Sequence, residues 1–284
     1  MNAIYRSARQ AQLIQTAYEA ALSHWPDSHS RINVPTRHGV THVVVCGPES
    51  APPVVLIHGS QTTAASWQHC AVDWSRHLRL YAIDVIGEAG PSAPSRLPLA
   101  GGLHAQWLSD VLDGLGVEQA AFVGISLGAW FALDFASRQP ARVSRLALLC
   151  PPGIGRQKRF LWWALPLLLL GGIGRAYVRE RVLGRLPPVS TPAERDAASL
   201  MEAIDHGFRP RLEVIPVFGD DVLQTLCVPM LVIVGGRDVM LDSSDTVRRL
   251  RQVAPKVEVR YLADQYHFIR GQRESLLRFL HPTG

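Results

Sequence analysis

The strongest chemical signal in the sequence is a serine flanked by glycines, in the segment Gly124–Gly128, which reads G-I-S-L-G. It follows a short apolar run, Ala121–Val123, and opens a segment with helical spacing, Leu127–Arg138. A serine on a sharp strand-to-helix turn needs small residues two positions before and after it, because neighbouring backbone passes closely there. The free N–H groups that begin the helix then point at whatever lies over the serine. This context indicates that Ser126 is a nucleophile.

A serine nucleophile needs a general base, and few histidines follow Ser126 in the chain. They are His206, His267 and His281. The first lies in a long segment without a clean strand, and the last lies in the terminal tail. His267 follows the last predicted strand, 257–261, in a loop before the final helix, where an imidazole can swing over the sheet. We therefore assign His267 as the base.

The base needs an acid to orient it, and Asp238 has the best position for that role. It comes directly after the predicted strand Leu231–Val234, and ligands bind at the carboxyl ends of such strands. The competing aspartates are Asp242, Asp245 and Asp264. The first two lie further into the next helix, where capping is the plainer role, and the third lies away from a strand end. The chain order Ser126, Asp238, His267 also matches the order expected of a nucleophile on this kind of turn.

Attack by a serine on a carbonyl creates an oxyanion, which two preset N–H donors must stabilise. One donor is the backbone N–H of Leu127, directly after the nucleophile. The other is expected from the loop after the predicted strand Val54–Ile57, and we assign the Ser60 N–H, with Gln61 as the alternative. In the same loop, we expect His58 to brace the backbone rather than to take part in catalysis.

The elements that must position these residues alternate between short apolar runs and helical patterns. The predicted strands are Val54–Ile57, Leu80–Ile83, Ala121–Val123, Leu146–Leu149, Leu231–Val234 and Val257–Tyr261. The predicted helices are Ala3–Leu22, Ser66–Arg76, Gly102–Leu115, Leu127–Arg138, Ser243–Val253 and Arg273–Leu280. Near-continuous apolar strands separated by helices indicate an α/β protein with a mostly parallel sheet covered on both faces. Two alternating runs hinged at His38-Gly39 add an antiparallel hairpin at one edge.

One interval breaks this alternation, since no clean strand appears between Gly153 and Met230, although one strand–helix step needs only about 30 residues. We expect a single domain over residues 1–284, with a helical cap inserted at 153–215. The cap residues Trp162, Trp163 and Leu167 are candidates to line an apolar acyl pocket. Two alternatives stay open: the apolar stripe simply packs the cap onto the sheet, or it makes a weak contact with an anionic membrane surface.

Composition limits the possible partners. The 284 residues include 29 basic and 24 acidic side chains, so 29 − 24 gives a net charge of +5 at pH 7. Residues 156–211 contain ten basic and five acidic side chains, so 10 − 5 places the whole excess on the predicted cap. No RNP, zinc-finger or helix-turn-helix pattern accompanies it, and we predict no nucleic-acid partner. If this charge acts, it attracts anionic substrates or membrane surfaces.

Cysteine usage and hydropathy bear on location. The four cysteines form no C-x-x-C pair, which argues against a disulfide scaffold or a zinc ribbon and predicts a reducing, cytoplasmic location; they are Cys46, Cys70, Cys150 and Cys227. The most apolar stretch, Phe160–Gly174, has about fifteen residues, whereas a membrane-spanning helix needs about 20. We therefore predict neither a targeting peptide nor a transmembrane segment.

Together these residues resemble the α/β-hydrolase fold family, from about Arg31 to the C-terminus. The matching motifs are His58-Gly59 after a strand, Trp67 early in the next helix, Asp84-x-x-Gly87-x-x-Gly90-x-Ser92, the Gly124–Gly128 turn, Gly235-x-x-Asp238 and His267. Within the family, the chain looks most like small bacterial carboxylesterase-type members with a helical cap. It departs from many members in the loop 84–92, which has no Pro before its first Gly and no His after it.

The resemblance implies an α/β-hydrolase fold and a serine hydrolase that uses no cofactor and no metal. Its substrate would be a small carboxylic ester with an apolar acyl group, cleaved through an acyl-enzyme on Ser126. The alternatives with the same triad are acyl transfer, thioester hydrolysis and cleavage of a C–C bond in a diketone. A further alternative is a ligand-binding relative without turnover. The sequence leaves the oligomeric state open.

Overall fold

The protein is built on one eight-stranded sheet with the strand order β1-β2-β4-β3-β5-β6-β7-β8. The computed structural model describes residues 4–282, without the side chains of Phe160, Leu161, Trp163 and Leu168. The strands are β1 (Ser30–Thr36), β2 (Gly39–Cys46), β3 (Pro53–Ile57), β4 (Arg79–Ile83), β5 (Ala120–Ile125), β6 (Val143–Leu149), β7 (Met230–Gly235) and β8 (Glu258–Leu262). β2 pairs antiparallel with β1 and β4, and the remaining pairs are parallel. The predicted α/β class and the edge hairpin are thus confirmed.

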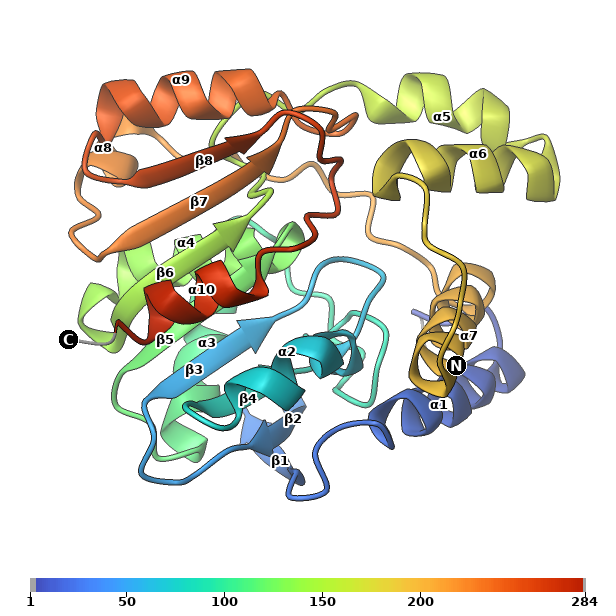
Figure 1. Ribbon diagram of the computed structural model, residues 1–284, viewed down its shortest axis with the longest axis horizontal. Coiled ribbons are helices and arrows are strands. Elements are labelled where there is room, and N and C mark those ends of the chain that lie inside the picture. The colour runs from blue at the N-terminus through green and yellow to red at the C-terminus, as the bar shows by residue number, and fades with distance from the viewer. Residues whose placement is uncertain (1–3, 283–284) are drawn as a thin grey trace.

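The strands β3, β5 and β7 are apolar along their length because both of their faces are buried. In β3, Val55 and Ile57 belong to one core, whereas Val54 and Leu56 belong to the core on the other face. Helices α3 (Leu103–Gly114), α4 (Leu127–Arg138) and α9 (Ser243–Val253) contribute to the first core, and helices α1 (Ala8–Leu22), α2 (Gln68–Trp74) and α10 (Arg273–Leu280) contribute to the second (Figure 1). The sheet is therefore held from both sides.

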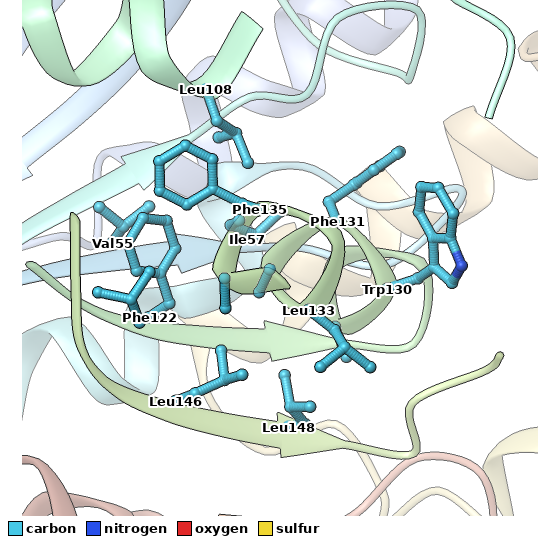
Figure 2. Packing of buried hydrophobic residues seen from close by; sticks show 14 of the residues in the cluster. Val55, Ile57, Leu108, Phe122, Trp130, Phe131, Leu133, Phe135, Leu146 and Leu148 are labelled. Carbon is cyan, nitrogen blue, oxygen red and sulfur yellow. The ribbon is translucent and has the colours of Figure 1, made fainter. Parts of the chain in front are cut away.

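Helix α4 is the most deeply buried helix next to the predicted nucleophile. Every residue from Leu127 to Ala136 is buried, so the helix has no solvent face in that stretch. Figure 2 shows Phe135 of α4 packed near Phe122 of β5 and aliphatic side chains of neighbouring strands, and Phe131 beside Trp130. Close packing of this kind fixes rotamers and resists displacement. The start of α4, which carries the Gly124–Gly128 turn, is thus a rigid support.

The strand order reverses direction at β3. The chain passes from β3 to β4 on one side and then returns to place β5 on the other side of β3. In open α/β sheets, ligands bind outside the carboxyl ends of the strands at such a switch point. Here the loops after β3 and β5 contain Ser60 and Ser126, respectively. The topology alone therefore brings these two predicted site residues together.

Two predicted helix starts are wrong. Helix α1 begins at Ala8 instead of residue 3, because the Ser7 side chain caps it by accepting the N–H of Gln10 at 3.1 Å, while Tyr5 forms a β-bridge with Phe208. The helix expected from Ser66 starts as a 3-10 turn, η1 (Ala64–Trp67), and continues as α2. A second 3-10 turn, η2 (Pro140–Arg142), follows α4.

The interval between β6 and β7 contains helices α5 (Phe160–Leu168), α6 (Gly171–Leu183), α7 (Pro192–Gly207) and the short α8 (Asp220–Gln224). Helices α5 and α6 pack on each other, whereas α7 packs on the N-terminal helix α1. In Figure 1 the α5–α6 hairpin lies beyond the carboxyl ends of β7 and β8, apart from α7. Within residues 4–282, no helix has the length and apolar character needed to cross a bilayer.

Candidate active site

Ser126 lies at the turn between β5 and α4 in a backbone conformation that side chains rarely adopt. Its φ of 52° and ψ of −120° fall outside the common regions, and its N–H donates to Leu149 O at 2.8 Å. A Cβ on Gly124 would lie 2.5 Å from Ala129 Cα, and one on Gly128 would lie 2.3 Å from Ile57 O. Both contacts are with backbone, so only glycine fits at these two positions. The geometry is the strained turn that the sequence motif predicts.

The structure brings Ser126, His267 and Asp238 into one hydrogen-bonded chain. His267 Nε2 lies 2.8 Å from Ser126 Oγ, and His267 Nδ1 lies 2.7 Å from Asp238 Oδ2. Because an ionised carboxylate only accepts hydrogen bonds, Nδ1–H donates to Asp238 and leaves Nε2 free to accept the serine hydroxyl proton. The three residues follow the carboxyl ends of β5, β8 and β7, as the chain order predicts.

Asp238 is held as a buried carboxylate. Burial by itself would raise its pKa, but the hydrogen bond and the charge of His267, together with backbone N–H groups, hold the pKa of Asp238 below its ordinary value. Those backbone donors are the N–H of Met240 at 2.7 Å and the N–H of Leu241 at 3.0 Å, both to Oδ1. Oδ1 of Asp238 therefore accepts hydrogen bonds from the backbone of its own loop, and Oδ2 accepts one from His267.

The three competing aspartates have other partners. Asp242 caps α9 by accepting the N–H of Asp245. Asp245 accepts hydrogen bonds from Arg248 and from the backbone N–H of Arg156. Asp264 is exposed and accepts a hydrogen bond from Arg237 at 2.6 Å. Of the four, Asp238 is the one in contact with His267 in the part of the chain that the structure describes.

Cys150 is a neighbour of the triad that the sequence analysis missed. It follows β6 directly, is fully buried, and has a positive φ of 45°. Its sulfur and the ligand atoms of Asp238 and His267 all lie within 4.8 Å of one another. Burial and the adjacent Asp238 carboxylate both raise the pKa of this thiol. Since the thiol stays protonated and His267 Nδ1 donates to Asp238, the three are arranged for hydrogen bonding and not as anionic ligands of a cation.

The loop after β3 lies directly beside the nucleophile turn. A Cβ on Gly59 would lie 3.5 Å from Ser126 Cβ, which shows how closely the two segments approach. His58 braces the loop, since its Nδ1 contacts Gly59 O at 2.8 Å and its Nε2 accepts the N–H of Val85 at 3.0 Å. The loop carrying the predicted donor Ser60 is therefore fixed against the neighbouring strand end.

Glu88 fixes the same loop from the other side. Its Oε2 accepts the N–H of Gln61 at 3.1 Å and the hydroxyl of Ser60 at 3.3 Å. Because the Gln61 N–H is engaged there, the contact favours the Ser60 N–H over Gln61 as the second oxyanion donor. From the sequence, Glu88 fits a structural or pocket-wall role better than a catalytic one, but its contact with residues 60 and 61 depends on tertiary structure and could not be predicted.

The Glu88 carboxyl is 2% exposed, and its Oε1 has no hydrogen-bond partner within the described residues. Burial raises its pKa, and the effect is partly offset by the Gln61 N–H and by the positive charges of Arg211 and Arg96. A carboxyl with a raised pKa binds its proton more tightly in the folded chain than in the unfolded chain. The loop that carries Ser60, the predicted second oxyanion donor, is thus held by a carboxyl group that titrates.

We expect Glu88→Gln to flatten part of the pH dependence of stability. In the wild type, the free energy of unfolding falls as the pH rises from the unfolded pKa of about 4.3 through the raised folded pKa, by about 1.4 kcal/mol for each unit of difference. Glutamine keeps an acceptor for the Gln61 N–H but does not titrate. Urea denaturation at several values between about pH 4 and pH 9 measures the effect. Parallel curves for the variant and the wild type would contradict it, and the exposed Glu118→Gln is the control.

Two adjoining cavities lie near the α5–α6 hairpin and the loop that contains Asp238. The larger, of about 880 Å³, is lined mainly by apolar side chains of α5 and α6, including Leu167, Leu170 and Tyr177, and by Val239 next to Asp238. The smaller, of about 430 Å³, lies against Asp238 itself and shares Lys158 and Arg181 with the first. Neither lining includes Ser126 among the described residues. The two cavities therefore adjoin the loop that contains Asp238 and do not reach Ser126 itself.

The three predicted substrate-binding residues have different positions. Leu167 lines the larger cavity. Trp162 does not line it; this residue is 78% exposed, and its spacing along the helix places it on the same side as Leu165 and Leu169. Trp163 lies among the side chains outside the description. A run of apolar residues on a short helix shows no clear inner face in the sequence, which explains why Trp162 was grouped with Leu167.

Comparisons with known proteins agree with this geometry. Residues 54–276 match the family described as Alpha/beta hydrolase family. The "Uncharacterized carboxylesterase nap" of Bacillus subtilis is 30% identical over 272 residues, which cover 92% of this chain and 90% of that protein. The crystal structure of carboxylesterase CesB (YbfK) from the same species aligns with a TM-score of 0.81 at 26% identity, covering 96% of this chain and 99% of the other. The naproxen esterase (carboxylesterase NP) structure, also from that species, gives 0.83 at 26% identity over 97% and 100%.

Proposed function

The chain belongs to the alpha/beta hydrolase family and is an esterase-like hydrolase, and we propose that it cleaves carboxylic esters through an acyl-enzyme intermediate on Ser126. The observation that carries the proposal is the hydrogen-bonded chain from Ser126 Oγ through His267 to Asp238. The carboxylesterase names of relatives that cover most of the chain support the same reaction class. Four free cysteines further support action in a reducing compartment, the cytoplasm.

The first half of the reaction forms the acyl-enzyme. Ser126 Oγ attacks the ester carbonyl carbon while His267 Nε2 takes the hydroxyl proton, over the 2.8 Å contact. Asp238 stabilises the resulting imidazolium from the Nδ1 side. The carbonyl oxygen becomes an oxyanion, which the N–H groups of Leu127 and Ser60 stabilise. The C–O bond to the alcohol then breaks, and His267 returns its proton to the departing alkoxide.

The second half releases the acid. A water molecule replaces the alcohol, His267 takes one of its protons, and the hydroxyl attacks the acyl carbon through the same oxyanion geometry. The bond to Ser126 Oγ breaks and the serine regains its proton from His267. The net reaction consumes one ester and one water and yields one acid and one alcohol. No cofactor enters this sequence.

We propose that residues 153–215 form the cap that selects the acyl group. The large cavity next to Val239 is apolar, and Leu167 is the predicted pocket residue that lines it. An apolar acyl group would enter this cavity with its carbonyl directed past the loop that contains Asp238 and Val239, toward Ser126. The substrate inferred from this arrangement is a small ester with an aliphatic or aromatic acyl group.

A rate series on aryl esters of increasing acyl length tests the function. We expect hydrolysis with saturation, and kcat/KM rising by up to about 4-fold for each methylene that the cavity buries, which corresponds to about 0.8 kcal/mol. Parallel assays with competing alcohols, thioesters and a diketone separate hydrolysis of esters from the alternative uses of the same triad. Rates equal to those in buffer for every ester would contradict the proposal.

A further inference from the structure

The α5–α6 hairpin exposes an unusual number of large apolar side chains. We call them the cap patch; its members are Trp162, Leu165, Leu169, Leu170, Ile173 and Tyr177. Their exposed fractions run from 52% for Tyr177 to 84% for Ile173. Scattered single apolar residues are normal on a protein surface, but six large exposed ones within residues 162–177 form a cluster of the kind that marks an interaction site. Something other than water is expected to cover it.

The protein itself does not cover this patch. Helices α5 and α6 pack mainly on each other, and no other element packs on either to a comparable extent within residues 4–282. The hairpin lies at the periphery of the fold, beyond the carboxyl ends of β7 and β8 (Figure 1). It is attached at its two ends: Lys158 Nζ donates to Asp238 O at 2.5 Å, and Arg270 donates to Leu183 O at 3.0 Å. The patch between these attachments faces outward.

Positive charge is concentrated in the segment of the chain that carries the cap patch. Residues 156–191 contain seven basic side chains and one acidic side chain, so 7 − 1 gives +6. Five of the seven have no acidic side chain within ion-pair distance in the described part of the chain; these are Lys158, Arg159, Arg175, Arg181 and Arg185. The other two, Arg156 and Arg179, pair with aspartates. The covering surface should therefore be both apolar and negatively charged.

We propose that the cap patch docks on a membrane that contains anionic phospholipid. A bilayer surface offers acyl chains to the leucines and isoleucine, headgroup phosphates to the arginines, and an interface that Trp162 and Tyr177 favour. A second copy of this chain fits less well, because two patches with the same positive charge would meet. Charge complementarity thus selects the lipid surface as the partner.

Docking in this way would place the larger cavity against the bilayer. Leu170, Ile173 and Tyr177 belong to the cap patch and also line that cavity. An ester dissolved in the membrane could then pass from the acyl-chain region into the cavity without crossing water. The docking itself is independent of the proposed ester hydrolysis, and the two can fail separately.

Vesicle co-sedimentation of the full chain tests the proposal. We expect at least about 10-fold tighter binding to mixed phosphatidylcholine–phosphatidylglycerol vesicles than to phosphatidylcholine alone. Raising the salt from about 0.1 M to about 1 M shortens the screening length from about 10 Å to about 3 Å and should weaken the binding. The double variant Leu165→Gln/Leu169→Gln should lose at least about 10-fold in affinity; Leu165 lies on α5, Leu169 is the C-cap of that helix, and neither lines the cavity.

A matched control uses exposed apolar residues outside the cap patch. Leu13 and Val72 are 46% and 43% exposed, and Leu13→Gln/Val72→Gln should bind vesicles like the wild type. Circular dichroism melting of each variant checks that it is folded. The proposal is overturned if wild type fails to sediment with anionic vesicles, or if both double variants bind equally well. It is also overturned if light scattering shows a dimer that Leu165→Gln/Leu169→Gln dissociates, since a second copy would then cover the patch.

Discussion

Ser126→Ala should lower kcat for an aryl ester by about 10⁶-fold, as removal of the nucleophile does in other serine hydrolases. The change deletes one oxygen, Oγ, which lies 2.8 Å from His267 Nε2. Alanine preserves the turn, since the backbone contact of residue 126 with Leu149 O and the two flanking glycines are unaffected. The loss would therefore be chemical and not structural. Steady-state kinetics with a check of the melting temperature measures it.

Ser137→Ala is the matched control for this variant. Ser137 lies at the other end of the same helix, and its hydroxyl donates to Asp134 O at 2.8 Å without reaching the site. We expect its kcat to stay within about 3-fold of the wild type, because surface substitutions of this kind have small effects. A Ser126→Ala protein with the activity of Ser137→Ala would show that another residue performs the attack.

Asp238→Asn should lower kcat by about 10⁴-fold, the effect of the equivalent change in a serine protease triad. The reason lies in the two N–H groups of Met240 and Leu241 that donate to Oδ1. They require the amide oxygen of the asparagine on their side and so turn its NH₂ toward His267 Nδ1. His267 must then accept at Nδ1 and carry its proton on Nε2, which is the wrong tautomer to take the proton of Ser126.

The rival acid Asp264 provides the control. It lies in the same loop as His267 but is exposed and paired with Arg237. Asp264→Asn should change kcat by less than about 3-fold, because exposed ion pairs contribute little. The assignment of the acid would be wrong if Asp264→Asn were the slow variant and Asp238→Asn the active one. Both variants can be compared with the same ester under the same conditions.

The sequence was sufficient for the features whose signals are local. Gly124 and Gly128 mark the turn because a Cβ at either position would clash with backbone, that of Ala129 in α4 and that of Ile57 at the end of β3, respectively. Asp238 and His267 could be assigned because parallel strands end at one edge, so residues after those strands converge there. The position of each strand follows from continuous apolar runs, which exist because both faces are buried.

The features that the sequence did not predict depend on contacts between distant segments. Glu88 contacts Gln61 and Ser60 across two loops, and this contact favours Ser60 over Gln61 as the second oxyanion donor. Cys150 reaches Asp238 only after β6 and β7 pair. Neither contact produces a periodic pattern in the sequence, because each is made by a single residue that follows the end of a strand.

In the predicted cap, the sequence likewise predicts helices but not how these helices pack. The helical pattern of residues 153–215 was visible, but the docking of α7 on α1, apart from the α5–α6 hairpin, was not. An apolar residue on a two-turn helix can point inward like Leu167 or outward like Trp162, and hydropathy does not separate them. The position of α6 against α5 sets which side chains of α5 point inward.

Covalent labelling of Ser126 tests the central claim most directly. A fluorophosphonate reacts with a serine that a neighbouring histidine activates, and intact-protein mass spectrometry followed by peptide mapping locates the adduct. We expect one adduct per chain, on the peptide containing Ser126, formed in parallel with loss of ester hydrolysis and absent in Ser126→Ala. An adduct on another residue, or full labelling of Ser126 with undiminished hydrolysis, would contradict the account.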